Sequence, residues 1–209
     1  MIETGFTSND IQRLYSEHEE KLESYAELLL WWNSKLNLVS RDVSRETLKK
    51  HIEHSLTLAP FLTGSKTVLD TGTGGGLPGI PLAICSSGVT YILNDIQLKK
   101  GAALRQMVFD LGLNNVTPDI RDISQVRIEN RVLVVSKHAF KLDYLIPAMS
   151  NINWSELIML KGLEDVVQEL NYFSDIKAQV IDLYDLMKDE WYKGKGILRL
   201  ANPIIERNG

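Results

Sequence analysis

The glycine-rich segment 68–82 constrains the fold of this chain more than any other stretch of its sequence. A short apolar run ends at Asp70, three glycines follow at every second position, and a second apolar run comes after them. Gly72, Gly74 and Gly76 can adopt backbone angles that are closed to other residues, and they let a ligand approach the main chain closely. This order predicts a buried strand, a tight loop and the start of a helix, whose N-terminal amides could hold an anionic group.

The spacing of the glycines distinguishes two classes of nucleotide-binding loop. A dinucleotide-binding fingerprint requires G-x-G-x-x-G, and Leu77 occupies the position of its third glycine. The pattern present, D-x-G-x-G-x-G, resembles the first motif of class I S-adenosylmethionine-dependent methyltransferases. The next predicted strand ends in Asp95, whose carboxylate could accept hydrogen bonds from two ribose hydroxyls.

Composition limits the classes of protein to which this chain could belong. The 209 residues fit one domain with an appendage, and the net charge of −4 argues against a large basic surface for naked nucleic acid, although a local basic patch is compatible with it. No apolar run is long enough to span a bilayer, and no signal peptide is evident at the N-terminus. The single cysteine, Cys85, lies in an apolar segment and is expected to pack in the core in a reducing compartment. These observations favour a cytoplasmic protein.

Residues 1–63 are predicted to be helical, because their apolar side chains recur at intervals of three and four. Residues 16–19 match a capping box, which predicts that the main helix begins at Ser16 after a short turn over residues 8–14. A further helix is expected to follow Ser44, a good N-cap, and to end near residue 58.

From residue 64 onward, short β-rich runs alternate with helices, a pattern typical of a mostly parallel sheet with helices on both faces. We therefore predict an α/β fold of the Rossmann-like kind, with an N-terminal helical extension (1–63) and a core (64–209). Two apolar-rich runs, 176–184 and 196–200, predict an antiparallel edge without a helix between them. The other predicted strands are 67–71, 90–95, 116–120, 132–136 and 156–161, and the predicted helices are 78–86, 98–111, 142–151 and 163–171.

The predicted sheet brings distant segments into one neighbourhood. In open sheets of this class, ligands bind beyond the carboxyl ends of the strands. That rule places the following segments together: 70–76, Asp95, 119–124, 136–140 and 160–162.

Several motifs outside the glycine loop resemble those of a single family. They are Trp32-Asn33, Asn37-Leu38, Ser40-Arg41-Asp42, His51-Ile52, Ser55-Leu56, Leu104-Arg105-Gln106 and the run from Gly76 to Leu82. Together they are similar to the bacterial 16S ribosomal RNA guanine-N7 methyltransferase G family, also called glucose-inhibited division protein B. The resemblance implies a class I methyltransferase core behind a helical cap, S-adenosylmethionine as cofactor, and a guanine of the small ribosomal subunit's RNA as acceptor.

The resemblance also implies which residues form the site. The expected cofactor-binding residues are Asp70, Gly72, Thr73, Gly74, Gly76, Leu77, Asp95, Ile96, Ile123, Ser124 and His138. The expected substrate-binding residues are Asn37, Arg41, Lys100, Arg105, Lys137 and Lys161. Guanine N7 carries an unprotonated lone pair, so no general base is required, and Lys137, His138 and Lys161 are candidates only for a positioning role.

Three places in the sequence depart from the family pattern. His138 stands where the family has arginine, and His54 stands where it has aspartate. In the segment 122–125, Asp122 and Ser124 stand where the family usually has arginine and glutamate, with Arg121 one position early. An ordinary histidine pKa near 6.5 would make a contact through His138 weaken between pH 6 and 8. These departures concern the acceptor more than the cofactor.

Alternatives remain at this point. His51 and His54 have a spacing that could seat a metal, but no third ligand of the right type is nearby, so no metal is expected. Trp32 lies on the apolar helix face, where packing is favoured over base stacking, and Lys100 or Arg105 could belong to a solvated helix face. A diverged methyltransferase with a small-molecule acceptor and a non-catalytic cofactor-binding protein stay open beside an RNA methyltransferase. We expect no membrane partner and favour a monomer.

Overall fold

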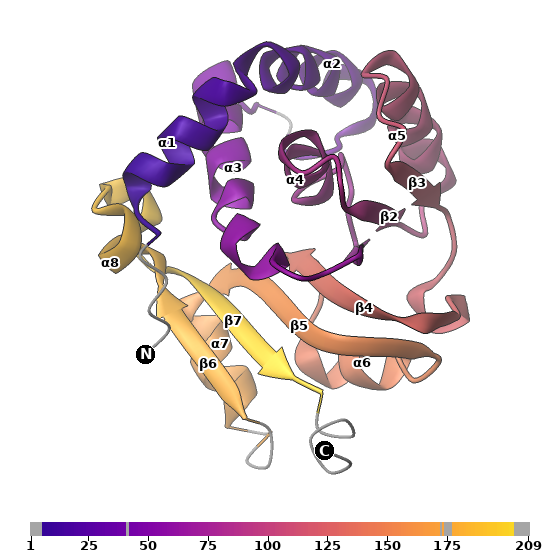
Figure 1. Ribbon diagram of the computed structural model, residues 1–209, viewed down its shortest axis with the longest axis vertical. Coiled ribbons are helices and arrows are strands. Elements are labelled where there is room, and N and C mark those ends of the chain that lie inside the picture. Colours follow the sequence, from indigo (N-terminus) through magenta and orange to yellow (C-terminus); the bar gives the residue numbers. More distant parts are fainter. Residues whose placement is uncertain (1–5, 41, 172, 174–176, 203–209) are drawn as a thin grey trace.

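A β-sheet separates two layers of helices in the computed structural model, which describes residues 6–40, 42–171, 173 and 177–202 (Figure 1). Within these residues the sheet has seven strands in the order β3-β2-β1-β4-β5-β7-β6. Strands β1 to β5 pair in parallel, and β7 runs antiparallel to both β5 and β6. Their bounds are β1 Thr67–Thr71, β2 Thr90–Asn94, β3 Val116–Asp119, β4 Ile128–Lys137, β5 Ile152–Gly162, β6 Ala178–Asp182 and β7 Lys195–Ala201. The predicted fold class and the antiparallel edge are confirmed.

The helices cover both faces of the sheet. Figure 1 shows α1 to α5 on one side and α6 and α7 on the other. Alternation along β4 matches this arrangement, because Leu133 and Val135 belong to the apolar cluster of the first layer and Val132 and Val134 to that of the second. The bounds are α1 Ser8–Glu17, α2 Glu19–Leu36, α3 Arg45–Leu56, α4 Gly79–Cys85, α5 Leu98–Asp110, α6 Leu142–Ala148, α7 Leu163–Leu170 and α8 Leu183–Met187.

The start of the helical extension differs from the prediction. Residues 8–17 form a full helix, α1, rather than a short turn, and the predicted capping box at Ser16 falls on the junction between α1 and α2. The capping residues are instead Thr7 and Asp10, whose carboxylate accepts hydrogen bonds from the Thr7 N–H and hydroxyl. The cap predicted at Ser44 is confirmed, since its Oγ accepts from the N–H of Thr47.

The antiparallel edge also differs in detail. Residues 183–187 form α8 instead of continuing the strand, because the carboxylate of Asp182 accepts a hydrogen bond from the N–H of Tyr184 and begins a helix there. Residue 176, where the predicted strand began, lies outside the described residues. Strands β4 and β5 begin earlier than predicted, since Ile128 pairs with Ile152 ahead of both predicted starts.

The extension packs directly on the core. Tyr25 on α2 is fully buried, and its hydroxyl donates to the carbonyl oxygen of Gly75 in the glycine loop. Trp32 is half-buried and packs against the same apolar cluster, as predicted, and Cys85 is also half-buried there. One apolar cluster therefore runs through both segments, and the division at residue 63 stays a prediction.

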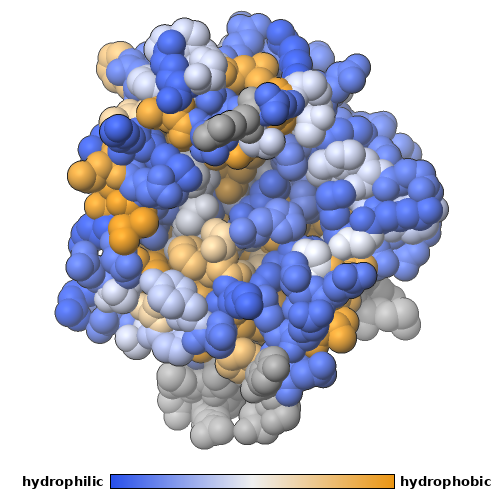
Figure 2. Space-filling model, turned by 180° about the vertical axis from the view of Figure 1, so that it is seen from behind, coloured by the Kyte–Doolittle hydropathy of each residue, from blue (hydrophilic) through white to orange (hydrophobic). Residues whose placement is uncertain are grey.

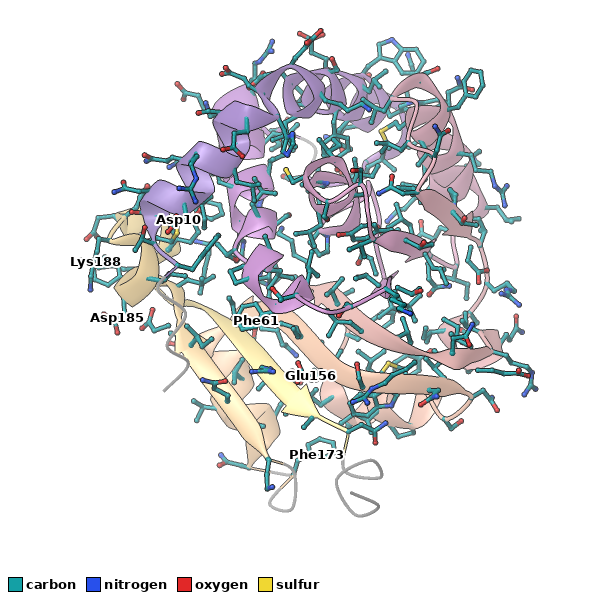
Figure 3. All side chains as sticks on the ribbon, viewed as in Figure 1. Asp10, Phe61, Glu156, Phe173, Asp185 and Lys188 are labelled. Carbon is teal, nitrogen blue, oxygen red and sulfur yellow. The ribbon has the colours of Figure 1, made fainter. Side chains whose placement is uncertain are left out.

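The surface carries separate apolar patches. The face in Figure 2 is largely hydrophilic, with hydrophobic residues in scattered groups. Figure 3 labels Phe61 and Glu156. The guanidinium of Arg199 on β7 pairs with Glu156 on β5 and lies 5.8 Å from the ring centre of Phe61. None of the described helices is long and apolar enough to cross a membrane.

Candidate functional site

The glycine loop after β1 has the backbone angles that its sequence predicts. Gly72, Gly74 and Gly76 have φ angles of +70°, +56° and +98°, in the region that favours glycine. A Cβ on Gly72 would lie 2.4 Å from the Cβ of Ala139 and 2.8 Å from the ring of Phe140. The loop therefore packs tightly against the segment that follows β4.

Asp70 supports this loop from inside the protein. It is fully buried, and its Oδ2 accepts hydrogen bonds from Thr73 Oγ1 at 2.6 Å and from the N–H of Gly79 at 2.8 Å. Within the described part of the chain, its Oδ1 has no hydrogen-bond partner. Burial raises the pKa of Asp70 to about 7. The first amide of α4 thus bonds to Asp70, whereas the sequence had suggested that it would face a ligand.

The titration of Asp70 predicts a pH-dependent stability. The unfolded carboxyl, with a pKa near 3.8, is ionised at pH 6, whereas the folded one still binds its proton. Folding then takes up a proton, so this contribution to stability is present at low pH and is lost as pH rises through 7. The free energy of unfolding should fall by about 1 kcal/mol between pH 6 and 8 relative to Asp70→Asn. Urea unfolding at several pH values measures this, and parallel curves for the two proteins would contradict it.

Asp95 lies just beyond β2 and connects two parts of the site. Its Oδ2 accepts a hydrogen bond from the N–H of Gly74 at 3.0 Å, and its Oδ1 accepts one from the N–H of Gln97 at 2.8 Å. The side chain is largely buried, yet it lines the cleft beyond the strand ends. Each oxygen keeps a lone pair that can accept a further hydrogen bond.

The cleft beyond the strand ends has a volume of about 590 Å³, within the usual range for small-molecule sites. Ten residues predicted for the site line it: Gly72, Thr73, Gly74, Leu77, Asp95, Ile96, Lys100, Ile123, Lys137 and His138. Ten others also line it. Five of them lie in segments predicted for this neighbourhood, Gly75, Arg121, Asp122, Ala139 and Phe140, and five were missed, Leu38, Val39, Asn94, Gln97 and Tyr144. The aromatic character of Tyr144 after the fourth strand was a usable signal, and Leu38 stands in the motif Asn37-Leu38 beside a predicted substrate-binding residue.

The remaining predicted residues lie away from the cleft. Gly76 forms the turn into α4, and Ser124 bonds through its hydroxyl to Asp122. Asn37 ends α2 in a left-handed conformation, beside Leu38 and Val39 of the cleft wall. Arg105 is exposed on α5. Asp70 is interior, as described, and Arg41 lies outside the described residues.

Lys161 has a different role from the predicted contact with a nucleotide. It is only 5% exposed, and its ammonium pairs with Glu169 on α7 and donates to the carbonyl oxygen of Phe140 at 3.0 Å. The other oxygen of Glu169 accepts from the N–H of Leu142 at 2.9 Å. This buried pair anchors both ends of the segment 140–142, and the ammonium does not line the cleft.

His138 lines the cleft in a left-handed conformation, with φ +52°, and its N–H donates to the carbonyl oxygen of Leu160. Partial removal from water lowers the pKa of its imidazole, and the charges of Lys137 and Lys195 lower it further. Solvent reaches the exposed residue and limits this effect, but the direction is downward. The lowered pKa moves any loss of charge at His138 to a lower pH than that of an ordinary histidine, and the pH dependence of its contact stays a prediction.

Lys137 is a half-buried cation of the cleft. Removal from water lowers the pKa of its ammonium to about 8, although the nearby carboxylate of Asp70 opposes this shift. Its Nζ lies 3.2 Å from Nδ1 of His51. The predicted location of Lys137 at the ligand edge agrees with this position.

Metal binding has no support among the residues that the structure describes, where no cluster of three or more histidine, cysteine or carboxylate side chains could hold an ion. His54 is fully buried among the rings of Trp191 and Tyr192. The two histidines of α3 therefore belong to a packed interface.

Sequence comparison identifies the family. A family model described as rRNA small subunit methyltransferase G, GidB, matches residues 18–146, well over half of the chain. The chain belongs to this family. The match includes α2 and α3 of the helical extension, the glycine loop and the cleft segments up to α6, so the resemblance in the sequence motifs is confirmed.

Curated relatives carry the name ribosomal RNA small subunit methyltransferase G. One from Chlorobium chlorochromatii (strain CaD3) is 42% identical over 144 residues, which cover 68% of this chain and 61% of the relative. One from Neisseria gonorrhoeae (strain NCCP11945) is 39% identical over 125 residues, which cover 58% of each chain. The matched part thus spans about three fifths of the length of these relatives.

Solved structures with a similar fold are methyltransferases. An O-methyltransferase from Bacillus cereus in complex with SAH has a TM-score of 0.57 at 18% identity and covers 86% of this chain and 91% of its own. A SAM-dependent methyltransferase from Aquifex aeolicus has a TM-score of 0.55 at 17% identity, with coverage of 77% and 100%. At these identities the likeness establishes the fold alone, which is that of class I methyltransferases.

Proposed function

We propose that this protein is an S-adenosylmethionine-dependent methyltransferase that modifies N7 of a guanine in 16S ribosomal RNA of the small subunit. The observation that carries the proposal is the placement of Asp95. Its carboxylate lines the cleft while it accepts a hydrogen bond from the glycine loop, so one residue links the loop to the position where a ribose would bind. Membership of the family supports the choice of acceptor.

The residues of the cleft suit this cofactor. Asp95 offers acceptors to two ribose hydroxyls, and Ile96 and Ile123 provide apolar contacts at the ends of β2 and β3, where an adenine ring could pack. Gly72 and Gly74 have no side chain to fill the space at the end of β1. When bound, S-adenosylmethionine supplies an electrophilic methyl group on a sulfonium. The residues of the chain have to bind and orient the cofactor and to exclude water from the cleft.

The acceptor would approach from the β4 side of the loop. Guanine N7 has a free lone pair, so the residues there need only align it with the methyl group, a contribution that reaches about 7–11 kcal/mol in well-oriented reactions. Tyr144 is 47% exposed in the cleft and stacks on Phe140 with ring centres 5.6 Å apart. Lys137 adds a charged donor that suits a phosphate or guanine O6.

Tyr144 is therefore expected to contribute to acceptor binding. Stacking of a base on an aromatic ring is worth about 1–3 kcal/mol, so Tyr144→Ala should lower kcat/KM for the RNA substrate roughly tenfold, and Tyr144→Phe should retain it. Cofactor affinity should stay unchanged in both. Phe109→Ala removes a ring that is 79% exposed on α5, outside the cleft, and serves as the matched control. Equal activity of Tyr144→Ala and wild type would exclude this role.

The function is tested by transfer of a labelled methyl group. The protein is incubated with labelled S-adenosylmethionine and small subunits that lack the modification, and the labelled nucleotide is mapped. Label at a single guanine N7 is expected. Cofactor binding without transfer to free RNA or subunits at any stage of assembly would overturn the proposal. The proposed setting is the cytoplasm, with a monomeric enzyme and ribosomal RNA as its partner.

A further inference from the structure

A hydrogen bond joins the helical extension to the cleft. His51 on α3 places its Nδ1 3.2 Å from Nζ of Lys137, the last residue of β4 and a lining residue of the cleft. The two residues are far apart in the sequence and meet only because α3 packs over the sheet (Figure 1). A side chain of the extension therefore supports a charged group of the core.

The direction of this hydrogen bond follows from the protonation of His51. Burial lowers the pKa of its imidazole to about 4, with further lowering by the charges of Lys137, His138 and Lys195, so the ring is neutral at pH 7. An ammonium group can only donate. Nδ1 of His51 is therefore the unprotonated nitrogen that accepts, and the ring proton lies on Nε2.

The ring of His51 is held in place from the opposite side. It makes an edge-to-face contact with Trp191, with ring centres 5.5 Å apart. The N–H of Trp191 donates to one oxygen of Asp189 at 2.9 Å, and the other oxygen pairs with Lys50 at 2.8 Å. Lys50 precedes His51 on α3, and Asp189 bonds to Trp191. The ion pair between Lys50 and Asp189 therefore fixes the ring of His51 relative to that of Trp191.

Charged and titratable groups surround Lys137 on every side. Asp70 on β1 favours the charged ammonium, and Lys195 on β7 disfavours it, as does removal from water. His138 follows in sequence, and His54 lies one turn beyond His51 on α3, its pKa also lowered by burial and by the charge of Lys137. Among these neighbours, His51 supplies the hydrogen bond that favours the charged form.

We propose that His51 is a positioning residue, which accepts a hydrogen bond from Lys137 and so holds a charged ammonium at the acceptor end of the cleft. The helical extension then completes the site instead of only covering the core. The link to methyl transfer rests on the proposed function, whereas the pairing of the two residues does not.

The pairing is tested in the free protein by NMR of ¹³C-labelled lysine side chains, with Lys137→Arg to assign the signal. His51→Phe keeps a flat ring against Trp191 and removes the acceptor. A hydrogen bond to a charged group is worth on the order of one pKa unit, so the pKa of Lys137 should fall by about one unit in this variant. His18→Phe, the same change at the junction of α1 and α2, should leave it unchanged. An unchanged pKa in His51→Phe would overturn the proposal.

The link to catalysis is tested by the pH profile of kcat/KM on unmethylated small subunits. Wild type should lose activity above about pH 8 as Lys137 loses its proton, and His51→Phe should lose it about one pH unit lower. Lys137→Arg should lack this loss. A uniform decrease of activity in His51→Phe, with no shift of the profile, would indicate packing alone and overturn the positioning role. An inactive wild type with the NMR shift present would refute the proposed function and leave the pairing established.

Discussion

Glu169→Ala is expected to lower the free energy of unfolding by about 3–5 kcal/mol, because it leaves the ammonium of Lys161 buried without its partner. The two side chains are 6% and 13% exposed, so water replaces the lost carboxylate poorly. The substitution also removes the acceptor for the N–H of Leu142 at the start of α6. Chemical unfolding followed by circular dichroism measures the change.

Two further variants separate charge from packing in this measurement. Lys161→Met combined with Glu169→Leu removes both charges and should recover much of the loss, since apolar residues can replace a buried pair. Asp185→Ala breaks the exposed pair with Lys188, labelled in Figure 3, and should have a much smaller effect. A loss in Glu169→Ala no larger than in Asp185→Ala would show that the buried pair contributes nothing to stability.

Asp95→Ala is expected to weaken binding of S-adenosylmethionine by about 10- to 150-fold. A hydrogen bond that involves a charged group is worth about 1.5–3 kcal/mol, and a tenfold change in affinity corresponds to about 1.4 kcal/mol. The substitution removes the proposed acceptors for the ribose and also frees the N–H of Gly74, which Asp95 holds at 3.0 Å. Both changes weaken binding of the cofactor, so the variant should show a lower affinity for S-adenosylmethionine rather than a slower reaction at saturating cofactor.

Titration calorimetry measures this affinity. Asp110→Ala is the matched control, since this carboxylate ends α5, bonds only to the exposed side chain of Gln106 in the described structure, and does not line the cleft. Its affinity should equal that of wild type. An unchanged affinity in Asp95→Ala would refute the ribose assignment and remove the main support for the cofactor site.

Some residues of the site could be located from the sequence, and others could not. Asp95, Gly72 and Gly74 line the cleft, as the sequence predicted, because an apolar run predicts a strand, and parallel strands present their carboxyl ends at one edge. The same rule located Lys137 there. These predictions need only the order of residues along the chain, because that order sets where each strand ends and where the glycine loop begins.

Charge pairing at the same edge could not be predicted in this way. Lys161 also ends a strand, and the sequence suggested a contact with substrate, yet Glu169 on α7 neutralises it in the interior. Likewise, the sequence motif locates Asp70 at the end of a strand but does not show its surroundings. Only the packing of α4 shows that Asp70 is fully buried. Whether a charge faces solvent or a partner depends on how neighbouring elements pack.

The sequence alone determined the family, the α/β fold with its antiparallel edge, and the location of the glycine loop and Asp95 beside it. Those features depend on short-range order: hydrophobic period, turn residues and motif spacing. Only the tertiary structure decided that Lys161 is paired and that His51 bonds to Lys137. Ionisable side chains respond to burial and to charges within a few ångströms, and such neighbours come together only when distant segments pack.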